Sequence, residues 1–370
     1  MTTAPDTITD LSALLLRWYQ TNHEGFADRF NAAIAGVQPP PPNPGNFVDW
    51  HGKTIHDLVG FFHEWYAFLP DVESGLDFIQ KFSWLYYKND AGLRFVTTGP
   101  GLDMTKYFVA LRGAYMDSGN PPTLALIEKW MRELGAEMNQ FVIPPGGYRT
   151  FNQFFARELK PGMRPIADPD DDSVVVAPAD CVINMIVDDL TVDTAIPVKG
   201  RVCLNVRELL NGSRYAANFV GGTAVSCILM PNTYHHYHAP VSGTVVESNE
   251  DVAGEYFGMK DFPAMLNKGD VGYGYDYSVF EHFRRGYLVI RTAQYGHVAV
   301  VPVGLNTIAS VVFDQQLKRV QSPAEVRVAK GDHIGYFQYG GSLNILLFEP
   351  GRFPSLRLLQ GQRIGTFSGS

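Results

Sequence analysis

The sequence predicts an α+β protein in which a helical N-terminal domain is followed by a β-rich domain. Three observations support this prediction. Residues 8 to about 141 carry apolar residues at helical spacing. Beyond residue 147, short β-branched runs alternate with glycine turns, which is typical of strands. The run Pro144-Pro145-Gly146-Gly147 separates the two patterns. We therefore expect one domain at residues 1–145 and a second at residues 146–370.

The helical pattern is clearest in five segments. They are residues 11–19, 55–69, 76–87, 104–115 and 124–141. A proline-rich run at residues 39–45 interrupts them and predicts a stiff, extended linker. The most aromatic stretch, residues 58–69, is broken by His63 and Glu64. We expect it to form an amphipathic core helix rather than a membrane anchor.

Composition narrows the class of protein. The chain has 370 residues, 45% hydrophobic and 18% charged, which is enough material for one large or two moderate cores. A net charge of −8 without a long basic run argues against nucleic acid or an anionic membrane surface as partners. No segment has the apolar length of a membrane span, and residues 1–10 lack the pattern of a signal peptide.

The three cysteines, Cys181, Cys203 and Cys227, are odd in number and too widely spaced for the usual zinc pairs. We expect reduced, mostly buried thiols. Together with the missing signal peptide, they predict a cytoplasmic protein.

A candidate self-cleavage site lies at Gly341-Ser342, directly before the apolar run 343–348. A serine hydroxyl held against the preceding carbonyl can convert the amide to an ester, and glycine permits the turn this requires. β-Elimination then cuts the chain between Gly341 and Ser342. The new N-terminus hydrolyses to a pyruvoyl group, an electrophilic ketone that can react with a substrate amine. By itself a Gly-Gly-Ser tripeptide is usually a flexible turn.

Upstream residues offer the base and the acid that such a nucleophile needs. Residues 234–240 contain three histidines; on an extended segment His236 and His238 share one face, while His235 lies on the other. Residues 174–176 have the pattern of a short buried strand that ends just before Asp180. We expect the Asp180 carboxylate to orient His238.

The order of these motifs resembles the phosphatidylserine decarboxylase family of pyruvoyl enzymes. The likeness covers about residues 148–352. Its parts are residues 151–155, 157–162, 164–166, 178–180, 198–200, 234–240, 301–304 and 330–342. The resemblance implies the β-rich catalytic fold of that family and a covalent pyruvoyl cofactor made from Ser342. It also implies cleavage into chains 1–341 and 342 onwards that stay associated, and a homodimer.

The resemblance also assigns roles to individual residues. It implies that Asp180, His238 and Ser342 form the triad that drives self-cleavage, and that His235 handles the proton during decarboxylation. No metal is expected.

Three residues near this chemistry depart from the family pattern. Leu343 replaces a small hydroxyl residue, Cys181 replaces glycine, and His236 replaces a residue that is commonly arginine. If that arginine holds a lipid phosphate, its absence weakens the case for a phospholipid substrate.

The helical N-terminal region resembles, more loosely, a soluble branch of the family that includes fungal L-tryptophan decarboxylases. We therefore expect a small-molecule amine substrate, a free L-amino acid such as an aromatic one. The alternative is phosphatidylserine, which would be converted to phosphatidylethanolamine.

Two hypotheses from other classes remain. Asp180, His236, His238 and His297 could bind a catalytic zinc in a hydrolase. That hypothesis leaves Gly341-Ser342 and the basic run 157–164 unexplained, and His297 on an alternating strand is more typical of a hydrogen-bonded core histidine. The second hypothesis is a family member that no longer cleaves itself and only binds a ligand. Leu343 keeps this hypothesis open, because the family usually has a small hydroxyl residue at that position.

Overall fold

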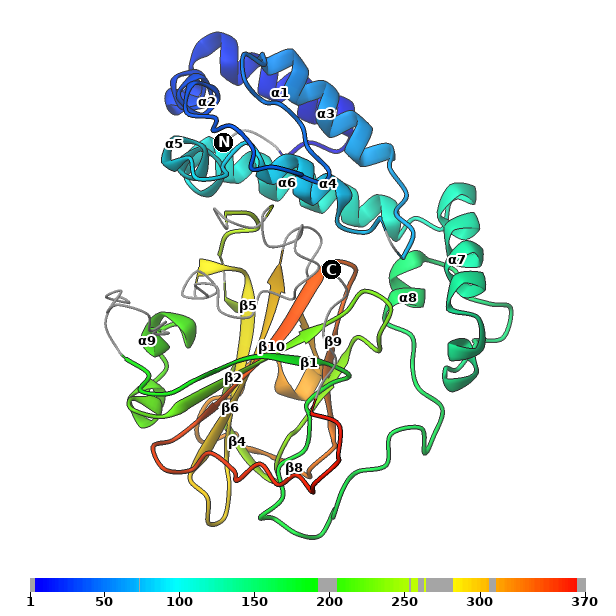
Figure 1. Cartoon of the computed structure of the whole chain (residues 1–370), viewed down its shortest axis with the longest axis vertical. Helices are drawn as coiled ribbons and strands as arrows, with labels where there is room; N and C mark the ends of the chain where they lie inside the picture. Colours follow the sequence, from blue (N-terminus) through cyan, green and yellow to red (C-terminus); the bar gives the residue numbers. More distant parts are fainter. Residues whose placement is uncertain are drawn as a thin grey trace.

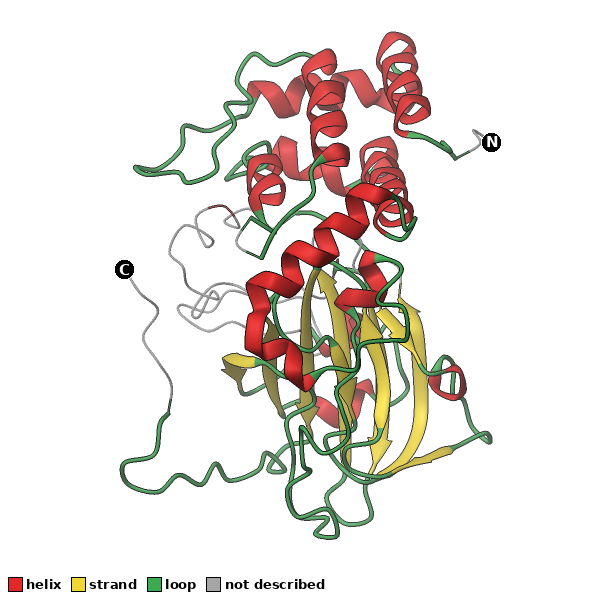
Figure 2. Cartoon of the chain, turned by 90° about the vertical axis from the view of Figure 1, so that its right-hand side faces the viewer, coloured by secondary structure: helices red, strands yellow, loops and turns green. Residues whose placement is uncertain are grey.

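A computed structural model of the chain describes residues 4–72, 74–191, 205–252, 254–258, 263, 282–305 and 311–364. The motif at 198–200 and Cys203 lie outside these residues. The fold is α+β, as predicted. Helices from the first third of the chain form a layer over one end of two antiparallel sheets (Figure 1). Seen from the side, the helices stand above the strands (Figure 2).

Several helices begin at a residue whose side chain caps them. Thr54 and Asp57 form a capping box at the start of α3, and the Thr7 side chain accepts the Asp10 N–H at the start of α1. The helices are α1 Ile8–Thr21, α2 Phe26–Ala35, α3 Ile55–Ala67, α4 Asp77–Ser83, α5 Asp90–Thr97, α6 Gly99–Met116, α7 Pro121–Leu134, α8 Phe151–Phe155 and α9 Val206–Leu209.

The five predicted helical segments correspond to α1, α3, α4, α6 and α7. Two of them end early. Helix α4 stops at Ser83, and α7 stops at Leu134 because Gly135 has a φ of 51°. Helices α2 and α5 were not predicted. In the described residues, no helix combines the length and apolar character needed to cross a membrane.

The strands form a seven-stranded sheet in the order β1-β2-β10-β6-β5-β4-β8 and a three-stranded sheet in the order β3-β9-β7. Among the described residues, neighbouring strands in both sheets pair antiparallel. The strands are β1 Val182–Val187, β2 Thr223–Leu229, β3 His236–His238, β4 Gly243–Val252, β5 Arg285–Arg291, β6 His297–Leu305, β7 Val311–Phe313, β8 Val326–Val328, β9 His333–Phe337 and β10 Gly341–Phe348.

The prediction of a strand at residues 174–176 is wrong. This segment is half-buried and irregular. Only isolated backbone hydrogen bonds join it and Pro178 to residues 238–240. Val176 N–H donates to Pro240 O at 3.0 Å, and Pro178 O accepts from His238 N–H at 2.7 Å. Pro178 has no N–H to donate, so a regular ladder cannot continue through it.

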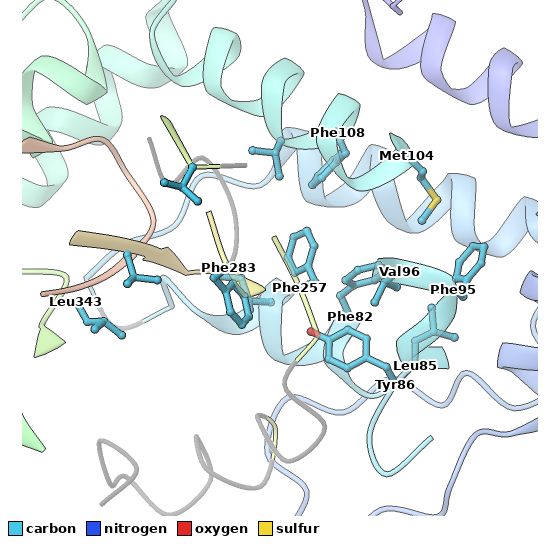
Figure 3. Close-up of a cluster of buried hydrophobic side chains, with 14 of the residues drawn as sticks. Phe82, Leu85, Tyr86, Phe95, Val96, Met104, Phe108, Phe257, Phe283 and Leu343 are labelled. Carbon is cyan, nitrogen blue, oxygen red and sulfur yellow. The ribbon is translucent and has the colours of Figure 1, made fainter. Parts of the chain in front are cut away.

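Strand β10 lies between β2 and β6 and separates two cores. Its residues alternate: Leu343 and Ile345 pack with the helices, whereas Leu346 and Phe348 pack in the core between the two sheets, called here the intersheet core. Figure 3 shows Leu343 near aromatic residues of the first core. By the same alternation, Ser342 lies on the intersheet side. Because the helices and the large sheet share one core, the division at residue 145 stays a prediction.

Candidate active site

Ser342 lies on the central strand β10, paired with Leu229 of β2 and with Gly304 of β6. Its side chain is buried, and its Oγ has no hydrogen-bond partner among the described residues. Leaving a buried hydroxyl unpaired costs about 1–3 kcal/mol, so such a group calls for a functional explanation. Fixed next to the Gly341–Ser342 peptide, this hydroxyl has no competing partner in the described protein.

His235 provides an unpaired nitrogen in the same part of the molecule. It directly precedes β3, and its carbonyl accepts from Phe337 N–H at 2.9 Å. Its Nδ1–H donates to Thr233 O at 2.9 Å, whereas the buried Nε2 has no partner among the described residues. Burial, assisted by the nearby Arg157 charge, lowers the His235 pKa to about 3. The ring is therefore neutral, with a free lone pair on Nε2.

The two candidate groups come from neighbouring parts of the β-rich region. The His235 ring packs on Phe155, with ring centroids 3.8 Å apart, in the cluster that also contains Tyr339 just before β10. Ser342 lies on the intersheet side of β10. The Ser342 hydroxyl and the His235 Nε2 are not hydrogen bonded to each other.

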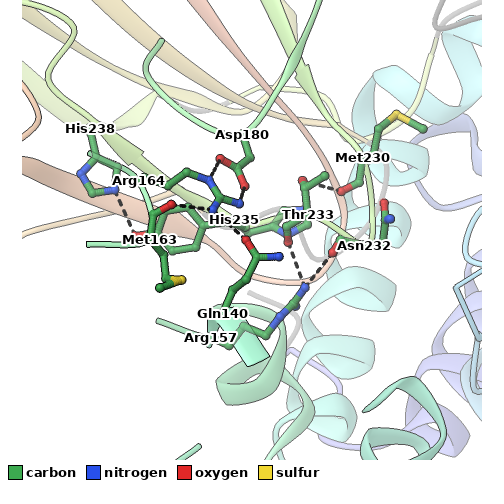
Figure 4. Close-up of polar contacts among 11 residues, drawn as sticks. Gln140, Arg157, Met163, Arg164, Asp180, Met230, Asn232, Thr233, His235 and His238 are labelled. Carbon is green, nitrogen blue, oxygen red and sulfur yellow. Dashed lines mark hydrogen bonds and ion pairs between the residues drawn. The ribbon is translucent and has the colours of Figure 1, made fainter. Parts of the chain in front are cut away.

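Arg157 fixes the loop that carries His235 (Figure 4). Its NH2 donates to Asn232 O at 2.7 Å and to Thr233 O at 3.2 Å, and the guanidinium lies 4.2 Å from the Phe141 ring centroid. Burial lowers the Arg157 pKa to about 10, which leaves it cationic at neutral pH. Because Thr233 O also accepts from His235, Arg157 helps to fix the orientation of the imidazole.

His238 and Asp180 share a pocket but are bonded to other groups (Figure 4). His238 Nδ1–H donates to Gly331 O at 2.9 Å, and its Nε2 accepts from Tyr234 OH at 3.0 Å. Asp180 accepts from Arg164 Nε at 2.8 Å and NH2 at 2.6 Å. None of these bonds joins Asp180 to His238, and none joins either residue to Ser342. The triad therefore stays a prediction.

The pocket that contains His238 and Asp180 has a volume of about 680 Å³, within the range of small-molecule sites. Lys160 and Arg164 lie on its wall beside apolar residues such as Ile166. It can therefore accept a ligand that is both anionic and partly apolar.

The zinc ligands suggested by the sequence are not brought together. Both ring nitrogens of His236 are occupied, one by His333 at 2.7 Å and the other by Ala156 O at 2.8 Å. His297 lies at the other end of β6 from the Ser342 pairing and contacts Glu349 at 2.7 Å. Among the described residues, no group of three or more His, Cys, Asp or Glu side chains is placed to hold a metal ion.

The predicted thiols are free where they are described. Cys227 is buried and Cys181, directly after Asp180, is half-buried.

Sequence reasoning gave no role to Arg157, Arg164, Tyr234 or His333, all of which contact the candidate histidines or Asp180 or fix the loop beside them. For the two arginines a signal existed, because both belong to a basic run that the rival hypotheses left unexplained. Tyr234 lies in the motif at 234–240, and its contacts with His236 and His238 are local. For His333 there was no signal, since its contacts depend on how β3 pairs with β9.

A neutral histidine and an unpaired, buried serine are the kinds of group that serine-based nucleophilic chemistry uses. Comparison with known sequences supplies the family. A profile described as phosphatidylserine decarboxylase matches residues 151–366, more than half of the chain. The chain belongs to the phosphatidylserine decarboxylase family.

Curated relatives carry the same description. Phosphatidylserine decarboxylase proenzyme 3 of Schizosaccharomyces pombe is 33% identical over 235 residues, which are 64% of this chain and 22% of the relative. The proenzyme of Clostridium novyi is 27% identical over 296 residues, 76% of this chain and 91% of the relative. Proenzyme 2 of Oryza sativa subsp. japonica is 31% identical over 71% of this chain and 39% of the relative. This chain thus spans about a fifth of the length of the yeast relative. Likeness to the tryptophan branch stays a prediction.

Proposed function

We propose that this protein is a self-processing, pyruvoyl-dependent decarboxylase that acts on the serine head group of phosphatidylserine. The observation that carries the proposal is the buried, unpaired Ser342 hydroxyl on the central strand β10, in a protein that also holds His235 neutral with an unpaired nitrogen. The relatives are named phosphatidylserine decarboxylase proenzymes, which favours this substrate over the free amino acid that sequence analysis placed first. The order of the two substrates is therefore reversed.

In the proposed self-cleavage, Ser342 Oγ attacks the Gly341 carbonyl carbon while a histidine accepts the hydroxyl proton. The amide nitrogen leaves, which gives an ester. Loss of the Ser342 Cα proton then breaks the Cβ–O bond and releases Gly341 as a carboxylate. Water converts the remaining dehydroalanine to the ketone, and ammonia leaves.

The pyruvoyl group, once formed, would supply a ketone that accepts electron density as carbon dioxide leaves. The protein's own residues would hold this group in place and neutralise the charge of the substrate. Burial of Leu343 to Phe348 between β2 and β6 would keep position 342 in place after the cut. Lys160 and Arg164 give the pocket a cationic wall, which suits an anionic phosphodiester despite the loss of arginine at position 236.

Two histidines compete for the role of base. The family resemblance assigns it to His238, with Asp180 as its partner and His235 reserved for decarboxylation. The free Nε2 lone pair favours His235, whereas His238 uses both nitrogens in hydrogen bonds. The His235 pKa of about 3 counts against it, because it makes this histidine a weak proton acceptor.

Intact-mass spectrometry under denaturing conditions tests the cleavage and the base together. The parent should give two chains split after Gly341, the shorter one reactive with a carbonyl reagent, and Ser342→Ala should give one chain. A cut Ser342→Ala protein would refute the cofactor assignment. If His238→Ala stays whole while His235→Ala is cut, the family assignment holds; the reverse result assigns the base to His235.

A free L-amino acid is the second candidate, favoured by the pocket volume of about 680 Å³, which suits a small molecule more readily than a lipid with two acyl chains. Processed protein is assayed for carbon dioxide release from phosphatidylserine in detergent micelles, from L-serine and from L-tryptophan. Formation of phosphatidylethanolamine supports the proposal. Turnover of a free amino acid alone would reject the lipid substrate and retain the decarboxylase.

A further inference from the structure

Three titratable side chains outside the proposed machinery form a continuous hydrogen-bonded chain behind β3. His236 Nδ1 lies 2.7 Å from His333 Nε2, and His333 Nδ1 lies 2.9 and 3.0 Å from the two oxygens of Asp314. At the other end, His236 Nε2 lies 2.8 Å from Ala156 O. This series of hydrogen bonds therefore links the residue after α8 with β3, β9 and the segment that follows β7.

The groups at the two ends of this series, the Ala156 carbonyl and the Asp314 carboxylate, determine how many protons the two imidazole rings carry. A carbonyl oxygen only accepts, so His236 Nε2 carries a proton toward Ala156. With Asp314 ionised, its carboxylate likewise requires a proton on His333 Nδ1. One more proton must lie between His236 Nδ1 and His333 Nε2, because two facing lone pairs at 2.7 Å repel each other. The two rings thus share three protons and one positive charge, which the Asp314 carboxylate neutralises.

The surroundings place this charge on His333. Burial lowers the His236 pKa to about 4, so His236 is the neutral member. His333 is about one-third exposed and directly faces the carboxylate. The titratable groups facing the two rings are Asp314, His238, Tyr234, Tyr336 and Arg157.

His236 is connected to both neighbouring histidines through the groups that contact it. The Tyr234 ring stacks on His236 with centroids 4.7 Å apart and an interplanar angle of 2°, and its hydroxyl bonds His238 Nε2. The Ala156 carbonyl that anchors His236 directly precedes Arg157, which fixes the carbonyl that orients His235. A change at His236 therefore reaches both candidate bases.

We propose that His333, held as an imidazolium by Asp314, is a positioning residue that fixes His236 and thereby the two neighbouring histidines of the site. The inference rests on the proposed function for its effect on catalysis. The arrangement of protons on His236 and His333 does not depend on the proposed function. Loss of the shared proton would release His236, and activity would fall with it.

Imidazole nitrogen chemical shifts of ¹⁵N-histidine-labelled protein measure the protons directly. The signals lost in His333→Gln identify His333. At pH 7 we expect both of its nitrogens to be protonated, and we expect His236 to be protonated on Nε2 alone. A neutral, singly protonated His333 at pH 7 would overturn the proposal.

The pH profile of decarboxylation measures the consequence. Asp314→Asn removes the counter-charge that faces His333, so the alkaline limb of the profile should move to lower pH. In His333→Gln the amide can still donate to His236 but cannot titrate, so activity should persist and this limb should disappear. In His333→Leu activity should fall roughly tenfold, as expected when an orienting hydrogen bond is lost.

The matched control is Glu349→Gln, which removes a carboxylate from a second histidine, His297, whose Nδ1 lies 2.7 Å from Glu349. Its profile should match that of the parent. Equal shifts in both carboxylate variants, or folded Asp314→Asn and His333→Gln proteins with the parent profile, would refute the positioning role. An uncut, inactive parent would instead contradict the proposed function, while the nitrogen shifts would still decide the proton count.

Discussion

Arg164 donates two hydrogen bonds to Asp180, one to each carboxylate oxygen, at 2.8 and 2.6 Å. This fork fixes the carboxylate on the pocket wall and places a guanidinium beside the space in which a head group would bind. The pair is partly exposed, with 42% of the Arg164 side chain and 25% of that of Asp180 accessible. Its role should therefore appear in substrate binding more than in stability.

We expect Arg164→Gln to raise the KM for phosphatidylserine roughly tenfold, since it removes a charge-assisted contact with the phosphodiester. Its free energy of unfolding should change by less than about 1 kcal/mol. Steady-state kinetics and urea denaturation measure the two effects. Arg291→Gln, which breaks a similarly exposed pair with Glu325, is the control. An unchanged KM would remove Arg164 from the binding site.

Leu343 should matter for stability rather than chemistry. It is fully buried in the core shared with the helices, on the opposite face of β10 from Ser342. Leu343→Ala should lower the free energy of unfolding by about 3 kcal/mol through lost burial and a cavity. The folded fraction should still be cut after Gly341, as intact mass can show. Leu358→Ala, at an exposed leucine, should change stability little. A stable but uncut Leu343→Ala protein would contradict this assignment.

His235 should make stability depend on pH. Its folded pKa of about 3 lies below the unfolded value of 6.5, so between these pH values the unfolded chain binds one more proton. The free energy of unfolding should therefore fall as pH falls through this window, by at most about 1.4 kcal/mol per unit from this residue.

Urea denaturation at several pH values measures this slope. The uncut Ser342→Ala chain is used, so that a single polypeptide unfolds. Adding His235→Gln should flatten the slope, whereas His56→Gln, at an exposed histidine, should leave it unchanged. Equal slopes in both variants would mean that His235 is not held neutral.

Arg157→Lys tests whether the guanidinium shape matters. Lysine retains the charge but cannot lie flat on Phe141 while it donates to both Asn232 O and Thr233 O. We expect a loss of about 2 kcal/mol of stability. We also expect slower decarboxylation, because the acceptor of the His235 Nδ1–H becomes mobile. Calorimetry and the carbon dioxide assay report these effects. Parent-like rates would show that the loop positions His235 without Arg157.

Much of the fold could be predicted because local patterns specify it. Apolar spacing identified α1, α3 and α6, and the run 343–348 is the apolar part of β10. Helix α2 was missed although Phe26, Phe30 and Ala33 share a buried face, because its start lacks a side-chain cap. The strand expected at residues 174–176 failed because burial alone does not supply a pairing partner.

The site was only partly predictable, for a different reason. Alternation along an extended chain correctly separated His235 from His236 and His238. Hydrogen-bond partners, however, come from distant segments: Arg164 reaches Asp180, and Gly331 reaches His238. Which nitrogen stays unpaired depends on these tertiary contacts, which no local pattern records.

The central position of β10 also sets an order of events. Chain termini usually lie at the surface of a domain, yet the proposed cut at Gly341 would create one in the middle of a sheet, between β2 and β6. Because the proposed cut needs the Ser342 hydroxyl and its base held in place, it would follow the formation of the surrounding sheet. Chains that fail to fold would therefore never acquire the reactive group, and folding itself would be the step that licenses activity.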